Sequence, residues 1–151
     1  MEKEILLFVT SIMGSLGFSI IFNIKGIKIL IASLGGGISY SIFLICMYSS
    51  DNLTLSIVLA SVTAATLAEI FARICKTPVT ILLVPMLIPL IPGGELYYAM
   101  NYIIFGDLLN FNMKIQLVVR EMGAIAGGII TVSFLAQFVT KLKNYIKQSA
   151  F

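Results

Sequence analysis

The run LTLSIVLASVTAATLAEIFA, residues Leu53–Ala72, carries Glu69 as its one ionisable side chain. An apolar helix of about 20 residues can cross the roughly 30 Å hydrocarbon core of a bilayer. Small residues recur at every fourth position of this run and so share one helix face: Ala60, Ala64, Ala68 and Ala72. Because close helix contacts in lipid depend on small residues, the stripe predicts a face that packs against another helix.

Further apolar runs lie on both sides of this one: Ile5–Ile24, Ile29–Ser49, Val79–Ile91 and Met122–Thr140. The 151 residues are 59% hydrophobic and 11% charged, whereas an average soluble domain has about 25% charged residues. A water-soluble fold could not cover so much apolar surface. We therefore expect an all-α, polytopic integral membrane bundle of about five transmembrane helices, with residues 1–151 as a single membrane domain.

Small residues also favour close packing in the first and last runs. Ser11 and Ser15, with Gly14 and Gly17, form such a face in the first run, and the last run has a GxxxG pair, Gly123 and Gly127. Packing within the chain is the simpler expectation for these faces. The alternative is that one of them receives a second subunit.

Cations follow the first, third and last runs, and none follows the second, which ends at Asp51: Lys25, Lys28, Arg73, Lys76, Lys141, Lys143 and Lys147. Cationic helix ends stay cytoplasmic. The pattern predicts a multi-pass plasma-membrane protein with the N-terminus outside, the C-terminus in the cytoplasm and an odd number of crossings. The polar stretch Glu95–Glu121 is then expected to re-enter the membrane or lie at its surface, with Arg120 and Glu121 interfacial.

The segment VPMLIPLIPGGE, residues 84–95, is the most informative for function. Pro85, Pro89 and Pro92 each lack a backbone donor, and Gly93 and Gly94 accept conformations that other residues resist. No regular helix is expected here. Irregular backbone at membrane depth lines cavities in transporters, so the segment predicts a discontinuous, Pro/Gly-broken helix beside a solute path. A turn at the membrane surface is the alternative.

Polar side chains inside apolar runs are costly and are therefore candidates for the solute or coupling-ion path. Glu95 follows the break and is a candidate to carry a proton or bind the amino group of a solute; a water-exposed helix start is the alternative. Glu69 is a second candidate, although Arg73 four residues later offers it an ion pair.

Two amides and a tyrosine complete the candidate path. Asn23 and Asn101 could donate to and accept from a carboxylate or a hydroxyl, and capping or helix packing is the alternative. Tyr97 is a candidate as well, although a tyrosine at this place is also typical of an interfacial aromatic belt.

The proline segment, followed by Tyr97-Tyr98-Ala99-Met100, resembles the signature of the threonine/serine exporter (ThrE) family, and GFSIIFNI, residues Gly17–Ile24, resembles that family's first helix. The length and the order of spans resemble the small, YjjB-type subunit of its split members. The resemblance implies half of a secondary exporter for threonine and serine, or for dicarboxylates such as succinate. Its implied partner is a larger YjjP-type membrane subunit, and a homo-oligomer is the alternative.

An enzyme is not expected. The chain has no histidine, Cys46 and Cys75 stand apart, and neither aspartate has a second carboxylate beside it, so the groups needed for a metal site or acid/base catalysis are missing. Gly35-Gly36-Gly37 lacks the Gly-Lys-Ser/Thr ending of a phosphate-binding loop. We expect no cofactor, no metal and no nucleic acid, and we keep a non-transporting assembly subunit as the alternative function.

Overall fold

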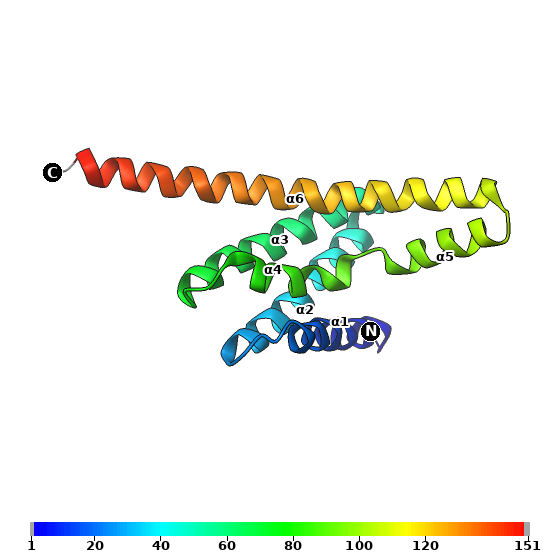
Figure 1. The fold of residues 1–151 in the computed structure, drawn as a ribbon, viewed down its shortest axis with the longest axis horizontal. Coiled ribbons are helices and arrows are strands. Elements are labelled where there is room, and N and C mark those ends of the chain that lie inside the picture. The colour runs from blue at the N-terminus through cyan, green and yellow to red at the C-terminus, as the bar shows by residue number, and fades with distance from the viewer. Residues whose placement is uncertain (1, 150–151) are drawn as a thin grey trace.

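A computed structural model describes residues 2–149, with side chains for residues 2–142, and these residues form helices without strands. The elements are α1 (Glu2–Ile21), α2 (Ile27–Ser50), α3 (Leu53–Ile74), α4 (Val79–Leu87), the short 3-10 helix η1 (Ile88–Leu90), α5 (Gly93–Ile104) and α6 (Leu108–Ser149). In Figure 1, α6 extends along one edge of the bundle and α1 lies at the opposite edge. The predicted all-α fold is confirmed.

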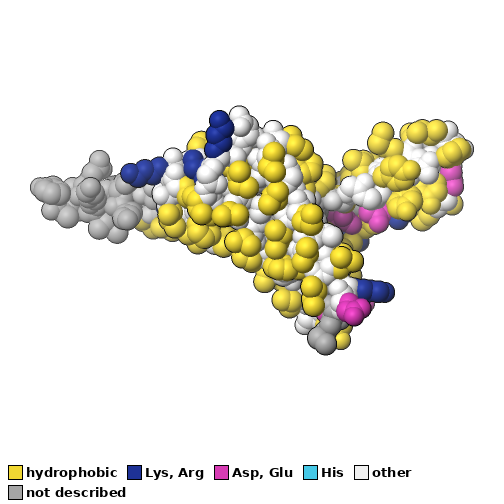
Figure 2. Space-filling model, turned by 90° about the horizontal axis from the view of Figure 1, so that it is seen from below, with side chains coloured by type: hydrophobic (Ala, Val, Ile, Leu, Met, Phe, Trp, Pro, Cys, Tyr) yellow, Lys and Arg dark blue, Asp and Glu magenta, His cyan; other side chains and the backbone are white. Residues whose placement is uncertain are grey.

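Four helices of the described part are long and apolar enough to cross a membrane: α1, α2, α3 and residues Leu108–Leu142 of α6. The pair formed by Val79–Leu90 and Gly93–Ile104 is bent by 62° and could be a fifth, broken span. Hydrophobic side chains cover much of the face seen in Figure 2, as expected of a surface in contact with lipid. The structure therefore supports the predicted bundle of about five spans with one broken helix.

Helix α2 packs against α1, α3 and α4 and so occupies the centre of the bundle. Its three consecutive glycines are buried because neighbouring helices lie directly on them. A Cβ on Gly35 would lie 2.5 Å from Met86 Cε of α4, and one on Gly37 would lie 2.5 Å from Ile12 Cγ1 of α1. The glycine run thus allows two helices to approach α2 closely, as small residues do in membrane bundles.

Helix α3 packs against α6, and its alanine stripe lies in the core cluster that α2, α3, α4 and α6 form together. All four alanines of the stripe are buried, which confirms the packed face predicted from their spacing. The two helices run in the same direction, because Ser61 contacts Gly128 and Arg73, twelve residues later, donates to Thr140 Oγ1 at 3.2 Å. A Cβ on Gly123 or on Gly127 would have nothing within 4 Å, so the contact glycine of α6 is Gly128.

The faces expected on α1 also differ from the structure. Ser11, Ser15 and Ser19 are buried, whereas a Cβ added at Gly14 or Gly17 would meet open space. The serines therefore form the packed face of α1. Buried Ser19 donates its hydroxyl to the carbonyl of Ser15 in the preceding turn, at 2.7 Å, so burial does not leave that hydroxyl unpaired.

The cations that follow the first and third apolar runs lie at the same end of the bundle as the C-terminal part of α6. Arg73 lies beside Thr140 at the C-terminal part of α6, and Lys25 and Lys28 line a groove with Thr80 at the start of α4. Glu4 lies near Ser49 at the other end. The chain therefore starts at one end of the bundle and reaches Lys141 at the other, as an odd number of crossings requires. Two lysines of the predicted pattern, Lys143 and Lys147, lie outside the described side chains.

The last helix is longer than expected, since α6 begins at Leu108 and not at Met122. Its 42 residues span about 63 Å, twice the thickness of a hydrocarbon core. The stretch Glu95–Glu121 is thus no separate segment: it divides between α5 and the first turns of α6, which pack together as a hairpin. The polar residues between Leu108 and Met122 do not interrupt α6, because no proline lies among them.

The proline segment is also more regular than predicted. Pro85 lies inside α4, and Gly93 and Gly94 form the first turn of α5 without a positive φ. One proline removes a single helix hydrogen bond, which a short helix packed between neighbours tolerates. The interruption is confined to η1 and the two residues after it, Ile91 and Pro92.

Candidate functional site

The helix break opens onto a cavity of about 170 Å³ between η1, α2, α3 and α6. We call this space the break cavity and define it by the residues that line it: Tyr40, Phe43, Leu53, Ile57, Pro89, Leu90, Ile91, Pro92 and Glu121. Two of the predicted prolines therefore lie on its wall. The remaining side chains come from segments up to 81 residues apart (121 − 40), which the sequence alone does not place together.

The geometry of the break follows from its two last prolines. Pro89 and Pro92 cannot donate to the carbonyls of Pro85 and Ile88, four residues earlier in each case. These carbonyls accept shorter-range bonds: Ile88 N–H donates to Pro85, and Ile91 N–H donates to Ile88 at 3.2 Å. The helix tightens into η1 and then turns. The break supplies a bend and a cavity wall, and both carbonyls are hydrogen-bonded.

Glu121 is the one buried charged residue among the described side chains, with 8% of its surface exposed. It makes no hydrogen bond or ion pair with any described residue and faces the break cavity. Glu121 lies on the buried face of α6, and its expected position at the membrane interface stays a prediction. The signal for the buried face was present: Val118, Glu121, Ile125 and Gly128 follow helical spacing.

Glu95, the carboxylate that the sequence favoured, has a partner. Lys114 Nζ of α6 donates to Glu95 Oε2 at 2.6 Å, and both side chains are about one third exposed. The same ammonium lies 5.8 Å from the centre of the Tyr98 ring. This pair joins α5 to α6 just beyond the break, so Glu95 belongs to the rim of the site and not to the lining of the break cavity.

The other predicted residues of this segment lie near the break but outside the cavity lining. Pro85 is fully buried one turn earlier, and Gly93 and Gly94 are exposed at the start of α5. Tyr97 is 66% exposed and meets the Tyr98 ring edge-on at 5.6 Å, in keeping with the aromatic-belt interpretation. Asn101 is half-buried on α5.

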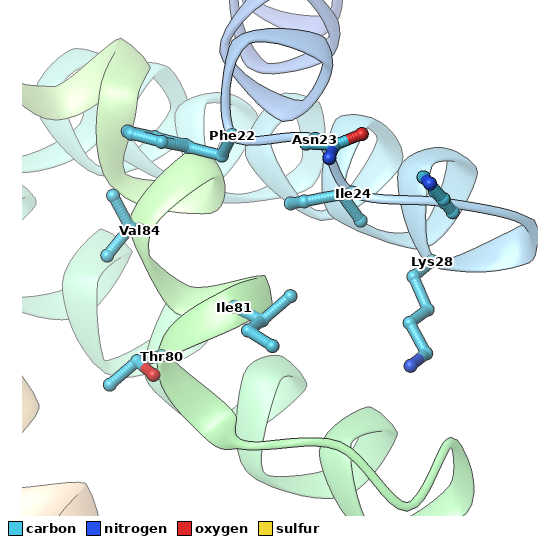
Figure 3. A pocket seen from close by; sticks show the side chains of 8 residues that line it. Phe22, Asn23, Ile24, Lys28, Thr80, Ile81 and Val84 are labelled. Carbon is cyan, nitrogen blue, oxygen red and sulfur yellow. The ribbon is translucent and has the colours of Figure 1, made fainter.

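Asn23 lies elsewhere, in a groove of about 520 Å³ at the cationic end. Figure 3 shows this groove between the α1–α2 connection and the start of α4, with Asn23 and Lys28 on one side and Thr80 and Ile81 on the other. Asn23 has a φ of 54° and ends the first helix. We call this space the cationic groove; its donors suit a carboxylate, but it is separate from the break cavity.

Glu69 occupies a third region. Its carboxylate pairs with Arg73 at 3.4 Å, which confirms the ion pair predicted from their spacing. Arg73 also donates to the carbonyl of Ala136 at 3.4 Å, so the pair holds α3 to α6. The structure thus divides the predicted path residues among the break, the cationic groove and this α3–α6 contact.

The described residues contain no group of three or more acidic, cysteine or histidine side chains that could hold a metal ion. A family model described as "Threonine/Serine exporter, ThrE" matches residues 7–135, which is most of the chain. No curated protein and no solved structure matches it. The matched range includes most of the first helix, the proline segment and the part of α6 that closes the break cavity. The chain therefore belongs to the threonine/serine exporter family.

Proposed function

We propose that this chain is the small membrane subunit of a split secondary exporter, and that its broken helix forms part of the solute path. The observation that carries the proposal is the break cavity, where a helix interrupted by Pro89 and Pro92 faces a buried carboxylate between apolar walls. Interrupted helices that face a polar group inside an apolar bundle are how many secondary transporters bind solutes and ions.

The charged residues that line the two cavities indicate which class of solute the protein favours. The break cavity is lined by Glu121 and by no cation, so an ionised Glu121 repels a carboxylate of the solute. The cationic groove has Lys25 and Lys28 and suits a carboxylate. A dicarboxylate such as succinate carries two carboxylates, whereas threonine or serine carries one. The arrangement therefore favours an amino acid over a dicarboxylate such as succinate.

A larger YjjP-type membrane subunit is the proposed partner. The hairpin of α5 and the first turns of α6 extends past the start of α3, since Leu53 of α3 lies level with Glu121. Large apolar side chains remain exposed at its tip: Ile104, Phe105, Leu108 and Leu109. A helix about 63 Å long cannot be covered by a single bilayer core when it stands upright, and a partner subunit would cover the rest. A homo-oligomer and a non-transporting assembly subunit remain the alternatives.

The subunit requirement is tested by transport of labelled threonine, serine and succinate from vesicles. Three preparations are compared: this chain alone, the larger subunit alone, and both together. We expect export of a small amino acid only with both. Export by the larger subunit alone at the full rate would make this chain an assembly factor, and export by this chain alone would favour the homo-oligomer.

The role of the break is tested in the same vesicles with the double substitution Pro89→Ala and Pro92→Ala. Alanine favours a helix by about 3 kcal/mol per site relative to proline, so the bend should straighten and the cavity wall should move. We expect normal insertion with loss of export. Pro78→Ala is the matched control, because Pro78 is exposed at the start of α4. Full export by the double variant would show that the break is only a turn.

A further inference from the structure

Glu121 is placed where an ionised carboxylate is costly. Its neighbours across the break cavity are Leu53 and Ile57 of α3 and Leu90 of η1, all apolar. A carboxylate that is largely withdrawn from water without a partner is destabilising unless it binds a proton or a cation. The Glu121 oxygens keep some access, because Ser15 Oγ is the one fully buried and unpaired side-chain polar atom among the described residues. No described residue pairs with Glu121, so the bundle itself does not neutralise this group.

The surroundings suit a proton better than a metal cation. Sodium or calcium needs about six oxygen ligands, and the cavity lining offers one carboxylate, one phenol hydroxyl from Tyr40 and whatever backbone carbonyls reach it. Within the described part of the chain, no two further acidic, cysteine or histidine side chains lie close enough to share a metal ion with Glu121. A proton needs only the carboxylate and an aqueous route, and the cavity opens at the helix break.

We propose that Glu121 is the coupling-proton site of the exporter: its carboxylate takes up a proton from water on one side of the membrane and releases it on the other. This inference rests on the proposed export function. One proton binds one carboxylate oxygen, giving a neutral carboxyl group, and no other bond changes. The sequence suggested Glu95 as the proton carrier. We assign this role to Glu121 because Glu95 forms an ion pair with Lys114.

Neighbouring charged groups change the electrostatic potential at the Glu121 carboxylate, but none of them binds it. Glu95 of α5 and Lys114 and Arg120 of α6 act on Glu121 through electrostatics, and Tyr40 of α2 lines the same cavity. Glu95 and Lys114 largely cancel each other as an ion pair. The elements on the other walls, α3 and η1, contribute only apolar lining residues.

The proposal is tested with Glu121→Gln in vesicles that contain this chain and the larger subunit. Glutamine keeps the shape of the protonated side chain but cannot release a proton. We expect the acceleration of amino-acid transport by a pH gradient to disappear, while exchange of labelled for unlabelled amino acid without a gradient continues. Asp107→Asn is the matched control, since Asp107 lies in the α5–α6 connection and should keep the pH response.

The outcomes separate this inference from the proposed function. If the wild-type pair transports no amino acid, the proposed function fails. If Glu121→Gln keeps the pH-driven acceleration, or loses exchange as well, Glu121 is not the coupling site. A sodium gradient that drives wild-type transport and no longer drives Glu121→Gln would replace the proton by sodium.

A direct measurement does not depend on transport. Infrared difference spectra of the purified chain between acidic and alkaline pH should contain the carbonyl band of a protonated carboxyl in an apolar site. We expect that band to be absent from Glu121→Gln and present in Asp107→Asn. An unchanged spectrum for Glu121→Gln would contradict the proposal whatever the transport assay shows.

Discussion

The contact between Gly128 of α6 and Ser61 of α3 gives a sharp test of the fold. A Cβ at position 128 would overlap Ser61 Oγ and would lie 3.0 Å from Ser61 Cβ and 3.1 Å from the carbonyl oxygen of Val58. The hydroxyl can rotate, but the Val58 carbonyl belongs to the backbone of α3. Gly128→Ala must therefore push the two helices apart by a few tenths of an ångström.

The neighbouring glycine provides the reference. A Cβ on Gly127 would have nothing within 4 Å. Both substitutions gain the same helix propensity, about 1 kcal/mol per glycine, so this gain cancels when the two variants are compared. What remains is the cost of overpacking, typically 1–3 kcal/mol. Gly128→Ala should thus have a free energy of unfolding about 1–3 kcal/mol lower than that of Gly127→Ala.

The assay is unfolding of the purified chain in mixed micelles by titration with dodecyl sulfate, followed by far-ultraviolet circular dichroism. Adding Ser61→Gly to Gly128→Ala removes both Ser61 contacts and should recover part of the loss. Equal stability of Gly128→Ala and Gly127→Ala would refute the contact between α3 and α6 at this position. Greater stability of Gly128→Ala would refute the direction of the reasoning.

Three further predictions concern packing, pH and orientation. Ala68→Leu should lower the free energy of unfolding by about 1–3 kcal/mol in the same titration, because Ala68 is fully buried, whereas Thr66→Leu on the exposed face should not. Hydrogen bonds from Asn110 hold the pKa of Asp107 below its usual 3.8. The ionised Asp107 therefore contributes to stability above about pH 4, and this contribution is lost as the pH falls through the lowered pKa. An NMR titration in which the Asp107 carboxyl resonance has a midpoint at or above 3.8 would contradict this. In a cysteine-free background, single cysteines at positions 50 and 149 should be labelled from opposite sides of the membrane, position 50 from outside; labelling from the same side would contradict the five-crossing topology.

The sequence by itself determined the class of the fold. Long runs of apolar residues can bury their backbone polar groups in lipid only as helices, so the composition and the lengths of the runs are enough to predict an all-α membrane bundle. The alanine stripe of α3 was predicted from its spacing alone, because a helix repeats every 3.6 residues whatever it packs against. The Glu69–Arg73 pair is equally local, four residues apart on one helix. The family resemblance came from the proline segment and the first helix, which are contiguous in the chain.

Tertiary structure decided what depends on contacts between distant segments. Whether a glycine is a contact or a gap depends on the helix opposite, and therefore Gly128 packs while the GxxxG pair of Gly123 and Gly127 faces open space. Glu121 follows Arg120 in the sequence and could face water or protein, and the packing of α6 against its neighbours places it inside the bundle. Glu95 looked unpaired because Lys114, its partner, is 19 residues away. Local patterns fix which segments are helices, whereas the direction and contacts of each helix decide which carboxylate is left buried and alone beside the break.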